Sequence, residues 1–203
     1  MMRSRLAIFV FVAWAVTGVA GVCFLNGYEL RAARTGPVTG YWPHSSSLQT
    51  VPGVATLIMA IHPRCPCSGA SVSELERVLS HQHARINAHL LVYQPKGYPA
   101  DWAMTALVRH AQTARDLNVV FDRGGGELSK FHARASGELW FYDGSGNLLF
   151  RGGITAGRGH PGRNAGLSSL ISLLEGERPV ADETPVFGCS IGGEDKPEDA
   201  LEK

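Results

Sequence analysis

The sequence has almost no net charge: its formal charge is +1 at pH 7 with histidine counted as neutral. It has no block of basic residues interleaved with aromatic residues, so neither a long-range field nor a stacking surface points to nucleic acid. The glycine-rich P-loop of nucleotide-binding proteins and the G-x-S-x-G turn of serine hydrolases are also missing. These absences argue against nucleic-acid binding, P-loop chemistry and serine-nucleophile catalysis.

Cysteine is scarce, with four residues among 203. Two of them, Cys65 and Cys67, lie one residue apart in the stretch "IHPRCPCSGASVSELERVL" (61–79). The pair has three interpretations at this point: a redox-active pair, half of a metal site, or two buried thiols that are close by chance. Their position in the predicted fold bears on the choice.

Charge is absent from the 20 residues 6–25, "LAIFVFVAWAVTGVAGVCFL", which is about the length of a membrane-spanning helix. Arg3 and Arg5 precede this stretch, and the positive-inside rule then keeps residues 1–5 in the cytoplasm. In a bacterium, a single-pass anchor at 6–25 in the inner membrane would place the rest of the chain in the periplasm. Cys23 is then an ordinary thiol of the membrane helix.

A cleaved signal peptide is the alternative, because Gly18-Val19-Ala20 has the small-x-small pattern of a cleavage site. The apolar stretch is longer than the roughly 7–15 residues usual in signal peptides, which favours the uncleaved anchor. Both interpretations place the following domain in an oxidising compartment, where disulfides persist.

Apolar periodicity predicts alternating strands and helices beyond the anchor. The run "VATLIMAI" (54–61) is continuous and of strand length, as in a central strand covered on both faces. Further strands are predicted at 88–94 and 118–122, a hairpin at 137–153, and helices around 72–79, 104–111, 127–133 and 167–174. This order predicts an α/β fold with a mostly parallel sheet, helices on both faces and closing antiparallel strands.

The predicted domain covers residues 51–178, and the composition changes on either side of it. Residues 26–50 are rich in Gly, Ser, Thr and Pro, as in a linker between anchor and domain. After Pro179 the chain turns polar, which indicates a tail over 179–203.

Cys65 and Cys67 follow the first strand and begin the next helix. The carboxyl edge of an open α/β sheet is where ligands and chemistry gather. A helix N-terminus offers free N–H groups and about half a positive charge, both of which favour a thiolate. Arg64 and His62 add local positive character, and Pro66 suits a helix start. Such surroundings lower cysteine pKa values to roughly 3.5–7.5.

An apolar strand, cysteines at a helix start, further βα units and a closing hairpin with a helix resemble the thioredoxin fold. The apolar N-terminus joined to such a domain is similar to the membrane-tethered thiol–disulfide oxidoreductases and redoxins of bacteria. The segment "TPVFGCS" (184–190) resembles the RedB-type redoxins. The resemblance covers about residues 50–178. It implies a central mixed sheet flanked by helices, thiol–disulfide exchange with protein partners, and no organic cofactor.

The resemblance also implies roles for single residues. If Leu75 is the buried leucine of the thioredoxin helix, Cys65 takes the place of the nucleophile and Ser68 that of the usual resolving cysteine. Cys67 lies between them, which is a departure and makes a C-P-C motif. A disulfide between residues two apart closes a small ring, and strained disulfides are more oxidising. Cys67 is the first candidate to resolve a mixed disulfide on Cys65.

A second departure concerns the loop before the hairpin. Thioredoxins have a cis-proline there, whereas this sequence has Ala135-Ser136-Gly137. Substrate binding as in thioredoxin is therefore not implied, although Ser136 still offers backbone groups to a bound chain.

The loop after the hairpin, "GGITAGRGHPGRNAG" (152–166), should return to the edge that carries Cys65. Arg158 or His160 would tune the thiolate there, or the loop would bind a substrate. The alternative is a glycine-rich connection with solvated polar residues.

Cys189 follows the last helix as an odd cysteine in an oxidising compartment. It is either a resolving partner of Cys65 or Cys67, reached by the tail, or a lone thiol packed by apolar neighbours.

Two functions of other classes stay open. Cys65 and Cys67 with His62 and His160 offer thiolates and imidazoles, which suit Cu(I) or Zn(II) in a copper chaperone of thioredoxin-like fold. A non-catalytic binding module that kept the fold is the other alternative.

Overall fold

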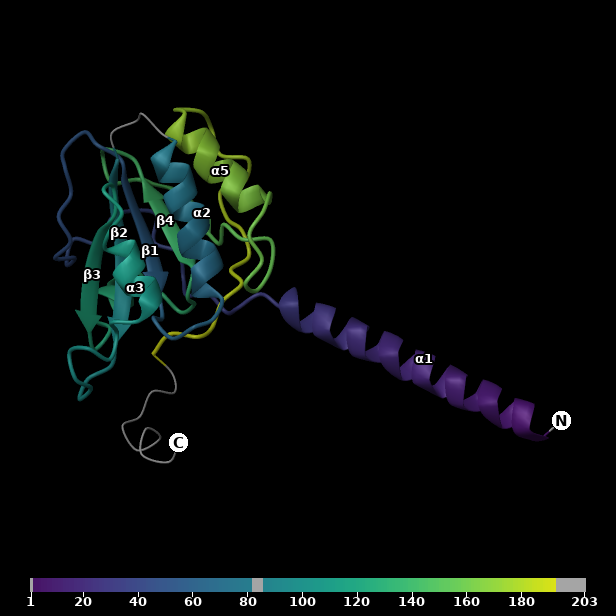
Figure 1. The fold of residues 1–203 in the computed structure, drawn as a ribbon. Coiled ribbons are helices and arrows are strands. Elements are labelled where there is room, and N and C mark those ends of the chain that lie inside the picture. Colours follow the sequence, from purple (N-terminus) through teal and green to yellow (C-terminus); the bar gives the residue numbers. More distant parts are fainter. Residues whose placement is uncertain (1, 82–85, 193–203) are drawn as a thin grey trace.

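A computed structural model of the chain describes residues 2–81 and 86–192 (Figure 1). Its helices are α1 (Met2–Glu29), α2 (Ser68–Ser80), α3 (Ala106–Ala111), α4 (Gly126–Lys130) and α5 (Ala165–Leu174). Its strands are β1 (Thr56–Ile61), β2 (Asn87–Gln94), β3 (Asn118–Arg123), β4 (Glu138–Tyr142) and β5 (Leu148–Gly152). The last part of the predicted tail, 193–203, lies outside the described residues.

The strands form one sheet in the order β3-β2-β1-β4-β5. β1 pairs in parallel with β2, and β2 with β3, whereas β4 is antiparallel to both β1 and β5. β1 is central and buried at every position, which explains its uninterrupted apolar sequence. The mixed sheet and the element order confirm the predicted α/β class and the thioredoxin-like fold.

Alternate residues of β1 supply two hydrophobic clusters, one on each face of the sheet. Leu57 and Met59 pack with the apolar side chains of α2, α3 and α5. Ile58 and Ala60 pack on the opposite face with Leu128 of α4 and with aromatic residues. The sheet therefore has helices on both faces, and its carboxyl edge is left to the loops that follow the parallel strands.

The segment before the domain packs against it. The indole of Trp42 meets the rings of Phe131 and Tyr142 edge-on, with centroids 5.3 and 5.2 Å away. The hydroxyls of Ser46 and Ser47 donate to the carboxylate of Glu127 at 2.9 and 2.7 Å. Burial raises the pKa of Glu127, but the hydrogen bond from Lys130 Nζ at 2.6 Å, together with those from Ser47 and Ser46, outweighs it and lowers the pKa to about 2.

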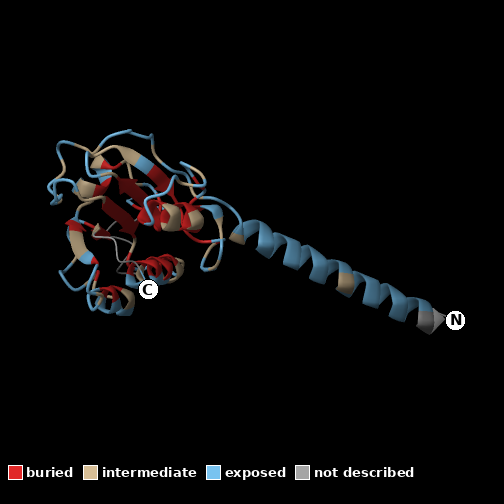
Figure 2. Ribbon diagram, turned by 90° about the horizontal axis from the view of Figure 1, so that it is seen from above, coloured by how far each residue is buried: buried red, intermediate tan, exposed pale blue. Residues whose placement is uncertain are grey.

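The helix α1 projects away from the domain (Figure 1), and almost all of its residues from Arg5 onward are exposed (Figure 2). Within the part of the chain that the structure describes, Arg5–Glu29 is the one helix long and apolar enough to cross a membrane. Leu6, Phe9 and Trp14 are each more than 60% exposed, a costly arrangement in water. A membrane span and a signal sequence both satisfy these observations.

Candidate active site

Cys65 and Cys67 lie in the short turn between β1 and α2. The backbone N–H of Cys65 donates to the carbonyl of His62 at 3.1 Å, and the N–H of Ser68 donates to the carbonyl of Cys65 at 3.1 Å. Cys67 is the residue at the N-cap of α2. Both thiols are thus held at the carboxyl edge of the sheet, beside the free N–H groups of a helix start.

The structure adds Cys189 to this pair. The sulfur atoms of Cys65, Cys67 and Cys189 all lie within 4.8 Å of one another. Cys65 is only 5% exposed, and all three cysteines are free thiols. The Cys189 thiol contacts Cys65, so it is not packed by apolar neighbours alone.

Backbone pairing brings Cys189 to the site. Residues 188–191 run antiparallel to residues 134–136, with a bridge between Ala135 and Ser190. The N–H of Ser136 donates to the carbonyl of Cys189 at 2.8 Å, and the N–H of Ile191 donates to the carbonyl of Arg134 at 2.9 Å. The backbone N–H of Ser136, one of the groups expected to serve a bound chain, is therefore taken by this chain's own tail.

Ser68 and Ser136 form a buried polar contact beside the cysteines. Their hydroxyl oxygens are 2.7 Å apart. Ser136 Oγ also accepts the N–H of His62 at 2.9 Å, and Ser68 Oγ donates to the carbonyl of His62 at 3.1 Å. There is no cis peptide bond among the described residues. The two serines therefore fix the turn that carries Cys65 where thioredoxins have a cysteine and a cis-proline.

The three thiols differ in acidity. Burial raises the pKa of Cys65, but hydrogen bonds from the Cys189 thiol, the Cys189 N–H and the Cys67 N–H outweigh it, so the pKa falls below its usual value. Burial and the charge of Cys65 raise the pKa of Cys67. Burial, the hydrogen bond to Cys65 and its charge raise the pKa of Cys189 to about 12. Of the three thiols, Cys65 is therefore the one that loses its proton most readily.

Arg158 is the cation of this cluster. Its guanidinium lowers the pKa of Cys67 in opposition to burial and to Cys65, both of which raise it. Its Nη1 donates to the carbonyl of Gly188 at 2.8 Å, and its guanidinium lies 5.3 Å from the centre of the Tyr28 ring. The loop after the hairpin therefore returns to the cysteines as predicted, and Arg158 is the residue that reaches them.

Two other polar residues of the loop, His160 and Asn164, point elsewhere. His160 Nε2 lies 3.2 Å from a carboxylate oxygen of Glu29, at the end of α1. Asn164 caps α5, where its Oδ1 accepts the N–H of Leu167 at 2.9 Å.

His62 and Arg64 contact aromatic residues. The His62 ring lies 5.8 Å from the ring of Tyr93 and 5.7 Å from that of Trp102. The guanidinium of Arg64 stacks over Trp102 at 4.7 Å. Among residues 2–81 and 86–192, the one group of potential metal ligands close enough to share an ion is the three cysteines. The predicted metal set that included His62 and His160 is therefore wrong in its histidines.

A buried ion pair next to the site was not predicted. Glu138 of β4 and Arg151 of β5 form this pair, with Arg151 Nε 2.9 Å from Glu138 Oε1 and side chains no more than 2% exposed. Glu138 Oε2 accepts the N–H of Arg134 at 3.1 Å. Burial raises the pKa of Glu138, and the Arg151 guanidinium opposes this. The pair holds the backbone on which the tail lies.

Cys189 also lines a groove of about 690 Å³. Its lining includes Tyr28 and the segment that follows α1, with the three arginines Arg31, Arg34 and Arg158. The thiol cluster is therefore next to the domain end of α1 and to a positively charged surface.

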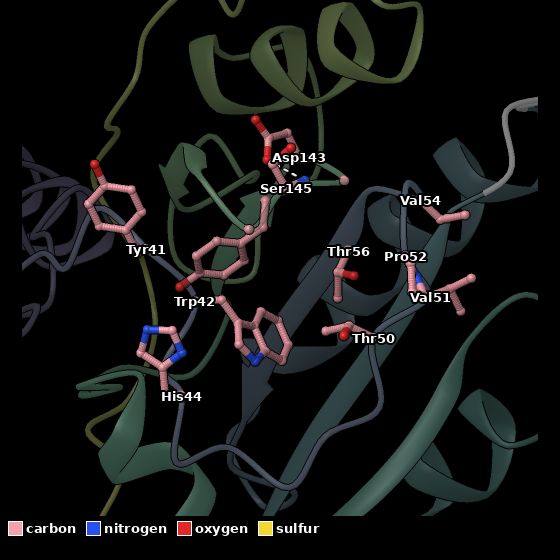
Figure 3. A pocket seen from close by; sticks show the side chains of 13 residues that line it. Tyr41, Trp42, His44, Thr50, Val51, Pro52, Val54, Thr56, Asp143 and Ser145 are labelled. Atoms are coloured by element: carbon pink, nitrogen blue, oxygen red, sulfur yellow. Dashed lines mark hydrogen bonds between the residues drawn. The ribbon is translucent and has the colours of Figure 1, made fainter.

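A second pocket, of about 310 Å³, lies between the pre-domain segment and the hairpin turn (Figure 3). Trp42, His44 and Thr50 line it from one side and Asp143 from the other. Asp143 accepts the N–H groups of Ser145 and Asn147 at 2.8 and 2.9 Å and so completes the turn. The pocket has no cysteine in its lining, and its carboxylate serves the hairpin.

The acidity of Cys65 depends on its neighbour, and this can be measured. Replacing Cys189 by alanine removes a hydrogen-bond donor to the Cys65 thiolate, so the pKa of Cys65 should rise. We expect the midpoint of the pH dependence of Cys65 alkylation by iodoacetamide, followed by mass spectrometry, to move to higher pH. Cys189→Ser keeps a hydroxyl donor and should move it less. A midpoint that stays or falls in Cys189→Ala would contradict this assignment.

No protein-family model matches the chain, and no curated protein matches it. An uncharacterized conserved protein from Geobacillus kaustophilus aligns with 19% identity and a TM-score of 0.57, over 83% of this chain and 95% of that chain. A hypothetical protein from Sinorhizobium meliloti 1021 aligns with 16% identity and a TM-score of 0.54, over the same shares of 83% and 95%. These two likenesses show the fold alone. A secreted Mycobacterium tuberculosis disulfide oxidoreductase aligns with 14% identity and a TM-score of 0.44, over 62% of this chain and 83% of that chain.

Proposed function

We propose that this protein is a membrane-anchored, extracytoplasmic thiol–disulfide oxidoreductase with Cys65 as its nucleophile. The observation that carries the proposal is the three-sulfur cluster at the start of α2, in which Cys65 alone has a lowered pKa. A thiolate is the attacking species in disulfide exchange, and a second thiol must be close enough to complete the reaction. The cluster provides both.

The exchange has two steps. The Cys65 thiolate attacks one sulfur of a partner disulfide, an S–S bond to Cys65 forms, and the partner's other sulfur leaves as a thiolate that takes up a proton. A resolving thiol then attacks the Cys65 sulfur after losing its own proton to solvent, and the first partner sulfur leaves. The partner disulfide is reduced to two thiols, and two thiols of this chain are oxidised to a disulfide. With a reduced partner the same steps run in reverse.

Cys189 and Cys67 are the two candidates for the resolving thiol, and we propose Cys189 as the first of them. Cys189 already contacts the Cys65 sulfur, whereas a Cys65–Cys67 disulfide closes a small ring. The pKa of Cys189 is raised to about 12, first by burial and then by its hydrogen bond to Cys65 and the charge there. The last two causes vanish once Cys65 is in a mixed disulfide, so Cys189 becomes more acidic when it is needed.

The domain end of α1, the proposed anchor, contacts the loop that carries Arg158 and His160. The N–H of Arg158 donates to the carbonyl of Glu29, the last residue of α1, at 3.0 Å. His160 lies 3.2 Å from the Glu29 carboxylate. If α1 spans the inner membrane with residues 1–5 in the cytoplasm, the thiol cluster faces the periplasmic surface of that membrane. The proposed partners are protein thiols and disulfides that reach this surface, and the RedB-type resemblance stays a prediction.

A redox titration of the full chain in detergent tests the proposal. Equilibration with defined ratios of reduced to oxidised glutathione should show a single two-electron step, with a Cys65–Cys189 disulfide located by peptide mapping. The step should vanish in Cys65→Ser and persist in Cys67→Ser. A chain that forms no intramolecular disulfide at any ratio would refute the oxidoreductase, and a Cys65–Cys67 disulfide would make Cys67 the resolving thiol.

The three sulfurs favour one other function, the transfer of a soft metal ion. Thiolates select Cu(I), and three of them within 4.8 Å of one another could share a trigonal ion. Reduced chain purified without chelator should then bind one equivalent of Cu(I) in competition with a chromogenic chelator. Binding that is lost in each of Cys65→Ser, Cys67→Ser and Cys189→Ser, without the redox step, would promote the copper chaperone. Unchanged binding in Cys189→Ser would exclude this site.

A further inference from the structure

The segment Gly188–Ile191, called here the tail strand, lies on the backbone of residues 134–136 and covers Cys65. Two backbone hydrogen bonds hold it, from Ser136 N–H to the Cys189 carbonyl at 2.8 Å and from Ile191 N–H to the Arg134 carbonyl at 2.9 Å. With the tail strand in place Cys65 is 5% exposed. A partner disulfide must reach the same sulfur, so the tail strand has to leave before a partner can bind.

Gly188 shows how closely the two backbones approach. A Cβ atom at this position would overlap the carbonyl oxygen of Ser136. The backbone of Gly188 does not have a positive φ, so its conformation alone does not require glycine. Closeness of approach is therefore the reason that a side chain cannot be accommodated directly before Cys189.

We infer that the tail strand is an internal copy of the partner segment that the site accepts. The inference rests on the proposed function. The partner's reactive cysteine would take the place of Cys189, with its carbonyl accepting the Ser136 N–H. A glycine would precede that cysteine, and the second residue after it would donate its N–H to Arg134, which excludes proline there. The partner class is thus an extended segment with the pattern Gly-Cys-x-(not Pro).

The competition between tail and partner also orders the reaction. While the partner occupies this backbone, Cys189 is away from Cys65, and the mixed disulfide persists. When the tail strand returns, it displaces the partner backbone and brings the Cys189 thiol to the Cys65 sulfur. The partner cysteine then leaves as a thiol, and the Cys65–Cys189 disulfide forms with the same electron balance as above.

The test uses the full chain with Cys23, Cys67 and Cys189 changed to serine, so that Cys65 is the one remaining thiol. In this background Gly188→Ala should expel the tail strand, and Ile191→Pro, which removes the N–H to Arg134, is an independent second way. Gly40→Ala is the matched control, because a Cβ there meets nothing within 4 Å. The probe is the peptide TPVFGCSIG, this chain's own residues 184–192, with its cysteine in a mixed disulfide with thionitrobenzoate.

Attack by Cys65 on this probe joins the peptide sulfur to Cys65 and releases coloured thionitrobenzoate. Release should be about tenfold faster in Gly188→Ala and in Ile191→Pro than in the background or in Gly40→Ala. In the two opened variants, probes with Ala directly before the cysteine (TPVFACSIG) or Pro at the second position after it (TPVFGCSPG) should react about tenfold more slowly than TPVFGCSIG. The free reagent dithiobis(nitrobenzoate) (called dithionitrobenzoate below) has no peptide backbone to pair with residues 134–136, so it should react equally fast with both opened variants.

Three results would overturn the inference. Equal rates for the three peptides would show that residues 134–136 do not select the partner. Rates that neither variant raises would show that the tail strand does not close the site. A Cys65 that fails to react even with free dithionitrobenzoate in an opened variant would refute the proposed function itself, and the inference with it.

Discussion

Cys65→Ser is expected to lower the rate of disulfide exchange by at least about three orders of magnitude, because a serine hydroxyl is not ionised near neutral pH and cannot replace a thiolate nucleophile. The rate is that of thiol release from oxidised glutathione by the reduced full chain. The size of the effect follows from burial, which is the largest cause that raises the pKa values of Cys67 and Cys189 and which does not depend on the charge of Cys65. Neither thiol should therefore replace Cys65 in the first step.

Three matched variants give this experiment its controls. Cys23→Ser removes an exposed thiol of α1 that is outside the cluster, and should leave the rate unchanged. Cys67→Ser and Cys189→Ser should keep the first attack, which makes them distinguishable from Cys65→Ser at early times. A Cys65→Ser chain that exchanges at the native rate would show that another thiol is the nucleophile.

Arg151→Met is expected to cost about 3–5 kcal/mol of the free energy of unfolding, because it leaves the Glu138 carboxylate buried without its counter-charge. Glu138 is fully buried, and Arg151 Nε lies 2.9 Å from its Oε1. The measurement is urea unfolding of the full chain followed by tryptophan fluorescence, since Trp140 lies beside Arg151. The same carboxylate accepts the N–H of Arg134, so the backbone under the tail strand should loosen as well.

Two further variants separate the buried charge from a general effect of substitution. Arg115→Met changes an exposed arginine and should shift the unfolding free energy by no more than about 0.5 kcal/mol. Adding Glu138→Gln to Arg151→Met removes the unpaired charge and keeps an oxygen for the N–H of Arg134, so it should restore part of the loss. If Arg151→Met is as stable as Arg115→Met, the ion pair does not support this part of the fold.

The fold could be predicted because each element has a local signal. The uninterrupted apolar run of β1 is what a strand covered on both faces requires, and the structure buries all of it. The boundaries were less exact because capping contacts decide them. The helix predicted from residue 104 begins at Ala106, since the Thr105 side chain accepts the N–H of Val108. The helix predicted over 127–133 ends at Lys130, and His132 has a φ of 55°.

Only the part of the site that lies in the turn between β1 and α2 could be predicted from the sequence. Cys65 and Cys67 could be placed from the sequence, because a strand followed by a helix fixes the edge where they lie. The approach of Cys189 depends on two backbone hydrogen bonds to residues more than fifty positions away. Hydrophobic periodicity in the sequence does not predict such contacts. A Glu and an Arg in the otherwise apolar strands of the hairpin were a usable signal for the pair Glu138–Arg151.

The histidines show the opposite error. His62 and His160 were grouped with the cysteines because imidazoles and thiolates share metals and because both lie in loops at one edge. In the structure, the His62 ring contacts the rings of Tyr93 and Trp102, and His160 contacts the carboxylate of Glu29 at the end of α1. Proximity to an edge does not fix the direction in which a side chain of a turn or loop points.

The central claim is that Cys65 attacks first and a neighbouring thiol finishes the exchange. The most direct measurement treats the reduced full chain with oxidised glutathione, quenches it with acid at short intervals, and maps every adduct by mass spectrometry. In the chain with Cys67→Ser and Cys189→Ser, glutathione should accumulate on Cys65. In the native chain that adduct should be brief and give way to a Cys65–Cys189 disulfide. Glutathione that appears first on Cys67 or Cys189 while Cys65 stays reduced would contradict the account.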